Sequence, residues 1–205
     1  TRMLFITAGL GGGTGTGAVP IIAQKSKEMG ILTVGIVTIP FRYEGRKRMK
    51  HAQTGLDELR QHVDSLLVIN NSNLLKICPP GTTQHQAFVM ADEVLYNSAK
   101  GIAEIITQQG YINVDFNDVH AVMHNSGTAL MGMALASGEN RATKVAQEAV
   151  NSPLLDNVDI NGARGILVNI RSNPDNFTLE EQTYILEAIQ HMPGDAAEVI
   201  FRVVH

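Results

Sequence analysis

Largely apolar stretches alternate with amphipathic ones along the first part of the chain. Residues 3–8 and 31–39 are rich in Ile, Leu, Val and Phe, as expected of strands buried on both faces of a sheet. The intervening stretch 18–29 mixes apolar with charged positions and is followed by Gly30, a typical helix stop. Strand, helix and strand in immediate succession predict a βαβ unit, and therefore a parallel sheet covered by helices.

Similar patterns extend over the rest of the chain. They predict further helices at residues 46–62, 84–109, 115–124, 141–150 and 178–191. They predict further strands at 64–70, 128–136, 165–170 and 198–204, and a loop rich in Asn and Pro at 70–81. The predicted fold is α/β, with a parallel-sheet half and a smaller α+β half. The long helix divides them, so we expect a first domain at 1–83, a central helix at 84–110 and a second domain at 111–205.

Composition narrows the class of protein without identifying it. Hydrophobic residues make up 44% of the 205 positions and charged residues 18%, which argues against disorder. The net charge of −4 gives no general attraction to nucleic acid or to an anionic membrane. Cys78 is the single cysteine, so no internal disulfide is possible. No apolar stretch approaches the roughly 20 residues that span a bilayer, and no signal peptide opens the chain, so we expect a cytoplasmic protein without membrane insertion. Because both ends fall inside predicted strands, we also expect a fragment.

A run of glycines and threonines follows the first predicted strand and leads into the first helix. It consists of Gly11, Gly12, Gly13, Thr14, Gly15, Thr16 and Gly17. Glycine lets the backbone approach a ligand closely, and a helix N-terminus offers unpaired N–H groups and a positive dipole end. A tight turn needs one or two glycines rather than five. The run therefore predicts a phosphate-binding loop.

The class of nucleotide is left open by this run. It is not a Walker A loop, since no Gly-Lys-Ser/Thr follows. Gly13, Gly15 and Ala18 loosely match the dinucleotide fingerprint, which keeps an NAD-binding Rossmann-type oxidoreductase as the alternative function. The first acid after the second strand, Glu44, comes later than that fingerprint requires. The seven histidines are scattered, with no metal-ligand or catalytic pattern, so no metal site is predicted from the residues.

Several polar and aromatic residues have two interpretations. Phe88 and Asp92 share a helix face at i, i+4, where packing and a surface charge explain them equally well. Asp115 and Asp118, at i, i+3, are suited to capping a helix N-terminus. Asn71 is an ordinary turn residue. On spacing alone, a structural role is at least as plausible for each of them.

Three motifs of this chain resemble those of one known family. They are the glycine run, a Pro-Phe-x-x-Glu-Gly-x-x-Arg segment ending at Arg48, and an Asn-x-Asp-x-x-Asp segment beginning at Asn113. The chain resembles the tubulin/FtsZ family of GTPases over essentially its whole length. The resemblance implies a tubulin-type fold in which the glycine run holds the phosphates of GTP. It implies that Glu44 contacts the ribose, that Arg48 lies on the phosphate side, and that Asn71 lies near ribose or base. Phe88 would stack on guanine, and Asp92 would accept its N1–H and N2–H groups.

The same resemblance implies a mechanism shared between subunits. Asn113, Asp115 and Asp118 would reach into the nucleotide site of the next copy, where the two carboxylates orient and polarise the attacking water and Asn113 helps to position the γ-phosphate. The products are GDP and phosphate, and Mg²⁺ accompanies GTP. The whole protein would polymerise head to tail at the midcell division ring and contact other division proteins through a tail that is absent here, without binding nucleic acid. A non-catalytic relative is a third hypothesis, which the intact Asp115 and Asp118 pair disfavours.

The resemblance also implies that part of the pocket is missing. Family members have a second glycine-rich loop earlier in the nucleotide domain, and this sequence lacks it. We therefore expect this chain by itself to bind GTP weakly or not at all, and to be inactive.

Overall fold

The computed structural model describes residues 1–108, 113–155, 163–191 and 197–204. The chain forms two compact units. The first comprises Thr1–Lys100 and Met123–Met131, and the second comprises Gly101–Val122 and Gly132–His205.

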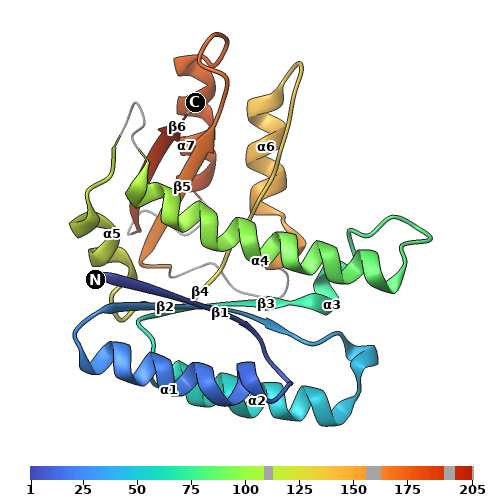
Figure 1. Cartoon of the computed structure of the whole chain (residues 1–205). Helices are drawn as coiled ribbons and strands as arrows, with labels where there is room; N and C mark the ends of the chain where they lie inside the picture. Colours follow the sequence, from blue (N-terminus) through green and yellow to red (C-terminus); the bar gives the residue numbers. More distant parts are fainter. Residues whose placement is uncertain (109–112, 156–162, 192–196, 205) are drawn as a thin grey trace. The chain divides into compact units, whose positions relative to one another are not determined.

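The first unit is built on a four-stranded parallel sheet in the order β1-β2-β3-β4. Its strands are β1 (Met3–Gly9), β2 (Leu32–Ile39), β3 (Ser65–Asn70) and β4 (Gly127–Ala129). Helices α1 (Thr14–Glu28) and α2 (Arg46–Arg60) cover one face, and α4 (Gln84–Thr107), as far as Lys100, lies across the other (Figure 1). Two short elements, η1 (Arg42–Glu44) and α3 (Asn71–Leu74), follow β2 and β3.

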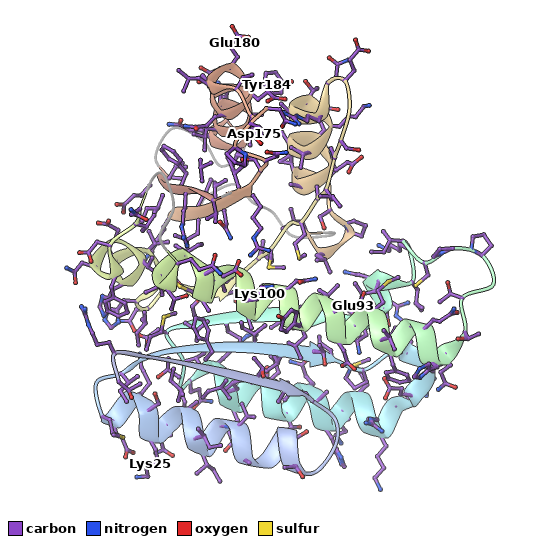
Figure 2. The ribbon with its side chains drawn as sticks, turned by 45° about the horizontal axis from the view of Figure 1, so that its top comes forward. Lys25, Glu93, Lys100, Asp175, Glu180 and Tyr184 are labelled. Atoms are coloured by element: carbon purple, nitrogen blue, oxygen red, sulfur yellow. The ribbon has the colours of Figure 1, made fainter. Side chains whose placement is uncertain are left out.

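Apolar side chains of β1, β2, α1 and α2 form the core of this unit. Each buried aliphatic side chain contributes about 1.5–3 kcal/mol relative to an exposed one. The buried cluster consists of Ile6, Leu10, Val19, Ala23, Val37, Ala52, Leu56, Leu59, Val63 and Leu66. Polar residues such as Lys25 lie on the outer side of α1, away from the sheet (Figure 2).

The second unit contains a two-stranded parallel sheet of β5 (Gly165–Arg171) and β6 (Glu198–Val204), with Gly165 opposite Glu198. Helices α6 (Arg141–Val150) and α7 (Leu179–Gln190) pack with it around a separate apolar core. The short helix α5 (Phe116–Met123) belongs to this unit except for its last residue, and η2 (Pro153–Leu155) follows α6.

The predicted α/β class, the parallel sheet and the long helix are confirmed. Most predicted elements end within two residues of the observed ones, a difference that the fraying of element ends accounts for. Residue 109, the last of the predicted long helix, lies outside the described residues, as does the predicted domain boundary at 110/111. Among the described residues, no helix combines the length and apolar character needed to cross a membrane.

Three predicted details are wrong. Helix α1 begins at Thr14 rather than at residue 18, so the second half of the glycine run is its first turn. The strand predicted over 128–136 ends at Ala129. Beyond Ala129, Gly132 lies so close to the carbonyl of Ala149 that a side chain has no room. This segment therefore packs against the end of α6 instead of pairing with a neighbouring strand. The loop predicted at 70–81 contains α3, whose N-cap Asn70 accepts a hydrogen bond from the Ser72 amide at 3.0 Å.

Candidate functional site

Three loops lead away from the carboxyl edge of the first unit's sheet. The glycine run follows β1, residues 40–45 follow β2, and α3 follows β3. Because the strands are parallel, these segments leave the same edge of the sheet, which is where open α/β sheets bind ligands.

The glycine run holds its shape through two close approaches. Gly11 has a φ of +103°, and a Cβ there would stand 2.7 Å from Pro40 Cγ and 2.8 Å from Arg48 Cγ. Gly15 lies against the carbonyl of Gly9, with no room for a side chain. These two glycines are therefore required by the protein's own packing.

Gly12 and Gly13 differ from these two, since open space surrounds the position of a Cβ and both residues are exposed. Gly13 is the N-cap of α1 and, having no side chain, accepts no hydrogen bond from the first-turn amides through one. The first-turn amides of a helix have no partner within that helix. This stretch thus combines accessible backbone with unpaired N–H groups and the positive end of the α1 dipole, a combination suited to an anion.

Glu44 and Arg48 are engaged with each other beside the run. The Glu44 carboxylate accepts the Phe41 amide at 2.8 Å and pairs with Arg48 Nε at 3.1 Å. The first contact fixes the η1 turn, and the second orients the guanidinium. The Arg48 side chain is 54% exposed, so its terminal nitrogens are accessible to an anion such as a phosphate. The Glu44 carboxylate already has two protein partners.

Aromatic rings form a compact group next to this turn. Phe41 is fully buried, Tyr43 stacks on it with centroids 5.0 Å apart, and Phe88 meets it edge-on at 5.2 Å. Phe88 stays 36% exposed, so part of its ring is accessible. Asp92 is exposed one turn further along α4. Partial burial, followed by the Glu44 carboxylate and Cys78, raises the pKa of the Tyr43 hydroxyl.

Asn71, the first residue of α3, carries an unusual feature. Its side chain is buried, with 5% exposure, and its Oδ1 has no hydrogen-bond partner. Nearly all buried polar atoms in native proteins are paired, because an unpaired one costs about 1–3 kcal/mol. An orphaned acceptor at a predicted ligand-contacting position fits a site whose missing donor comes from the ligand.

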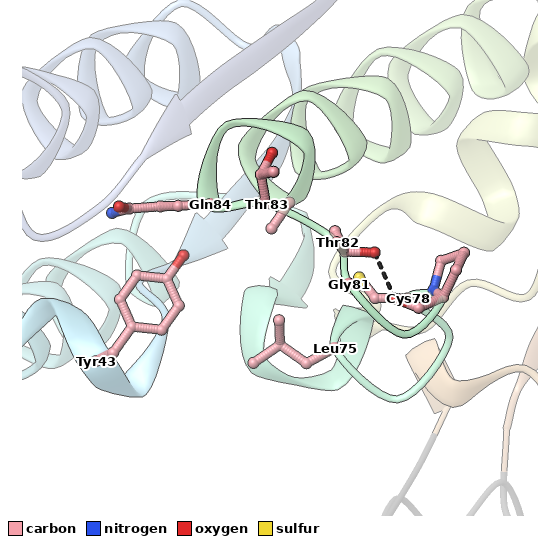
Figure 3. Close-up of a pocket in the computed structure, with 9 residues that line it drawn as sticks. Tyr43, Leu75, Cys78, Gly81, Thr82, Thr83 and Gln84 are labelled. Carbon is pink, nitrogen blue, oxygen red and sulfur yellow. Dashed lines mark hydrogen bonds between the residues drawn. The ribbon is translucent and has the colours of Figure 1, made fainter.

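A pocket of about 440 Å³ adjoins the aromatic group, a size typical of small-molecule sites. Tyr43 and Leu75 face the segment 81–84 across it (Figure 3). Thr82 Oγ1 donates to the Pro79 carbonyl at 2.7 Å and holds the loop in its turn. The lining residues are Tyr43, Leu75, Cys78, Pro79, Gly81, Thr82, Thr83, Gln84 and Ala87. Apart from the Asn- and Pro-rich composition of the loop, no sequence pattern distinguishes these residues.

Asn113, Asp115 and Asp118 are exposed in the second unit, at the start of α5. Asp118 Oδ2 accepts the Asp115 amide at 3.2 Å, and Asn117 Nδ2 donates to Asp115 Oδ2 at 2.8 Å. The Asp118 carboxylate therefore has the capping role suggested by the spacing, whereas the Asp115 carboxylate accepts a side-chain amide. Both carboxylates remain accessible, so capping does not exclude a second role.

No group of three or more His, Cys, Asp or Glu side chains suited to a metal ion occurs among the described residues.

Comparison with known proteins adds an independent result. Residues 1–79 match the family model described as Tubulin/FtsZ family, GTPase domain, and residues 127–204 match FtsZ family, C-terminal domain. The chain is 50% identical to the cell division protein FtsZ of Buchnera aphidicola subsp. Schizaphis graminum over 97% of its own length and 51% of the relative's. It is 48% identical to that of Coxiella burnetii over 100% and 53%, respectively.

A solved structure described as an empty FtsZ dimer from M. jannaschii is similar over the whole chain and 59% of its own, with 47% identity and a TM-score of 0.94. The chain spans about half the length of the curated relatives that it matches. The two family models match the chain in the same order as its two compact units, and about half of its residues are identical to those of family members. The chain therefore belongs to the tubulin/FtsZ family.

Proposed function

We propose that this chain carries the core of a GTP-hydrolysing protein that assembles head to tail into filaments and acts in bacterial cell division. Relatives about half identical to it are named cell division protein FtsZ, and a similar solved structure is described as a dimer. Family membership gives no support to the NAD-linked oxidoreductase that the loose glycine match left open.

The observation that carries the proposal is the accessible backbone of Gly12 and Gly13 at the start of α1. The run from Gly11 to Gly17, with Arg48 beside it, would hold the phosphates. Phe88 would stack on the guanine, and the Asp92 carboxylate would accept its two adjacent N–H donors, a pair that adenine lacks. Asn71 would accept a hydroxyl or amine of the ligand with its unpaired Oδ1. Glu44 would act on the ribose side, mainly by holding the turn and Arg48.

Hydrolysis in this proposal uses Asn113, Asp115 and Asp118 of one copy against the nucleotide of the next. Phosphoryl transfer to water depends mainly on positioning and on charge compensation. The exposed carboxylates would orient and polarise the water, and Asn113 would help to place the γ-phosphate. Mg²⁺ would enter with GTP and compensate phosphate charge.

The remaining parts of the proposal concern the cell. The protein would act in the cytoplasm at the midcell ring, together with other division proteins. The net charge of −4 favours no nucleic acid partner.

The test is the GTPase rate per molecule of the full-length protein as a function of its concentration. A shared site predicts that the rate rises with concentration and then levels off, whereas a rate that is independent of concentration contradicts sharing. Asp115→Asn and Asp118→Asn should each lower kcat at least tenfold at unchanged GDP affinity. Asp175→Asn, at another exposed aspartate of the second unit (Figure 2), is the matched control and should have no effect.

Nucleotide identity is tested separately, by competition. GTP and GDP should displace a labelled guanine nucleotide from the full-length protein, and NAD⁺ should not. Displacement by NAD⁺ at a similar concentration would remove the guanine assignment.

A further inference from the structure

We infer that Gly55, on α2 and outside the glycine run, is a positioning residue for the phosphate-binding loop. It makes room for the methyl group of Thr16, and the Thr16 hydroxyl is thereby fixed on the backbone amide of Gly11. The inference rests on the proposed nucleotide function for its consequence, while its geometric part concerns the protein alone.

The contact between the two helices is close at this point. Gly55 is buried on α2, and a Cβ there would lie 2.5 Å from Thr16 Cγ2, 3.3 Å from the Thr16 carbonyl oxygen and 3.4 Å from its Cα. Real Cβ atoms do not tolerate the first distance, so any residue other than glycine must displace Thr16 or separate α2 from α1.

Thr16 cannot yield without losing a hydrogen bond. Its Oγ1 accepts the Gly11 amide at 2.8 Å. Cγ2 and Oγ1 are carried by the same carbon, so a rotation of χ1 that moves the methyl group away from Gly55 also moves the hydroxyl away from Gly11. Threonine is β-branched and stiff about this bond, so the positions of its methyl group and its hydroxyl are coupled.

The helix is weakened at this same residue. Pro20 follows four positions later inside α1 and has no N–H, so the Thr16 carbonyl lacks its usual helical donor. A displacement of Thr16 is therefore resisted less by the helix than at a normal position. It would be transmitted to the Gly11 amide.

Gly11 in turn sets the course of the accessible backbone. Leu10 is anchored by its amide to the Thr38 carbonyl at 2.9 Å, and Gly11 is anchored to Thr16. Gly12 and Gly13 follow directly. Thr16 also keeps its own hydroxyl proton for donation, because it serves Gly11 as an acceptor. Gly55 thus determines both the direction of a backbone donor and that of a side-chain donor.

The experiment uses the full-length protein with Gly55→Ala, Thr16→Ser and the double variant. Hydrogen exchange of the Gly11 amide and GDP affinity are measured for each. Gly55→Ala should speed Gly11 exchange and weaken GDP binding about tenfold, the equivalent of one lost hydrogen bond. Thr16→Ser removes the methyl group, keeps the hydroxyl and should cost about threefold. In that background Gly55→Ala should add less than about twofold, because the 2.5 Å clash with the methyl group is gone and only the longer contacts with the Thr16 backbone remain.

Two further variants separate positioning from general packing. Gly101→Ala introduces the same change in α4, at a helical glycine with nothing within 4 Å of its Cβ position, and should leave both readouts unchanged. Thr16→Val keeps the shape, loses the hydroxyl and should speed Gly11 exchange even if Gly55→Ala does not fold. Unchanged Gly11 exchange in Thr16→Val, or equal effects of Gly55→Ala in both Thr16 backgrounds, overturns the inference. If the unmodified protein binds no guanine nucleotide, the proposed function fails, while the exchange data still test the coupling between Gly55, Thr16 and the Gly11 amide.

Discussion

At the scale of single residues, Asp64 is the most strongly engaged side chain of the first unit. Its carboxylate is 2% exposed, and its Oδ1 pairs with Lys27 Nζ at 2.7 Å and with His124 Nδ1 at 2.9 Å. Its Oδ2 accepts the Thr33 amide at 2.9 Å. Burial raises the pKa of this carboxyl, but the Lys27 and Thr33 hydrogen bonds outweigh burial and hold it below 3.8. Asp64 therefore joins the end of α1 to the starts of β2 and β3.

Asp64→Asn should lower the free energy of unfolding by about 2–4 kcal/mol at pH 7, since Lys27 loses its buried partner. A carboxyl whose pKa is depressed by folding stabilises the protein above its unfolded pKa, and this stabilisation is lost as the pH falls through the folded value. The difference between the two proteins should thus shrink below about pH 4. Urea unfolding at pH 7 and pH 3 measures both effects.

Glu28→Gln is the control for Asp64→Asn. It removes an exposed ion pair with Lys25, in which the side chains are 48% and 68% exposed, and it should change stability by less than about 0.5 kcal/mol. An equal loss of stability in the two variants would contradict the role assigned to Asp64.

Asn71→Ala should separate folding from binding. The orphaned Oδ1 contributes nothing favourable to the free protein, so the variant should be nearly as stable as the parent, within about 1 kcal/mol. GDP affinity of the full-length protein should fall about tenfold if Oδ1 accepts a ligand donor. Asn169→Ala removes another buried, unpaired asparagine oxygen, in the second unit, and should leave GDP affinity unchanged.

At the scale of elements, one residue pair joins α6 to α7. Arg141 Nε and Nη2 donate to the two oxygens of Glu181 at 2.6 and 2.9 Å. Glu181 also completes the capping box of α7 with Thr178. The Arg141 hydrogen bond is the main reason that the pKa of Glu181 is lowered to about 2, and the Thr178 amide adds to it.

Glu181→Gln keeps the capping geometry and removes the charge. Because the pair is partly exposed, the expected loss is small, about 2 °C in Tm at pH 7. The contribution of Glu181 is complete above its unfolded pKa and is lost as the pH falls from about 4.5 towards 2. Thermal unfolding at pH 7 and pH 2 should therefore show a difference between parent and variant only at the higher pH.

The sequence predicted elements best where periodicity alone decides. The bounds of α6 and β6 were predicted without error, since each is a single amphipathic or apolar run. The start of α1 was missed because glycine disfavours helix interiors, whereas Gly15 is needed there for its approach to the Gly9 carbonyl. The end of β4 was missed because apolar residues after Ala129 pack against other parts of the chain, and a pattern cannot distinguish packing from pairing.

At the scale of the whole molecule, short motifs identified the family, and long-range packing escaped prediction. The boundary between the two compact units falls inside α4, at Lys100/Gly101, and inside α5, after Val122. Each of these helices thus packs with different partners along its length. The pocket beside Tyr43 was not predicted for a similar reason, since its lining joins residues about 40 positions apart in the sequence. Motifs are local in sequence, whereas domain boundaries and pocket linings depend on contacts between distant segments.

The shared site makes a prediction that only an assembly of copies can fulfil. Asp118→Asn keeps an intact nucleotide site but has a defective acidic loop, the segment that carries Asn113, Asp115 and Asp118. Asp92→Ala, at the proposed guanine contact on α4, has a defective nucleotide site and an intact acidic loop. Each alone should be nearly inactive. In filaments of the two mixed equally at random, about a quarter of the contacts join an intact nucleotide site to an intact acidic loop, so about a quarter of the parent GTPase rate should return. Sedimentation must first establish that both variants enter the filaments. Replacing the Asp92→Ala partner with a chain carrying both changes removes every productive contact and should abolish the recovery. If mixed filaments form and the rate stays at the level of the separate variants, hydrolysis occurs within a single copy and the acidic loop acts only as a helix cap.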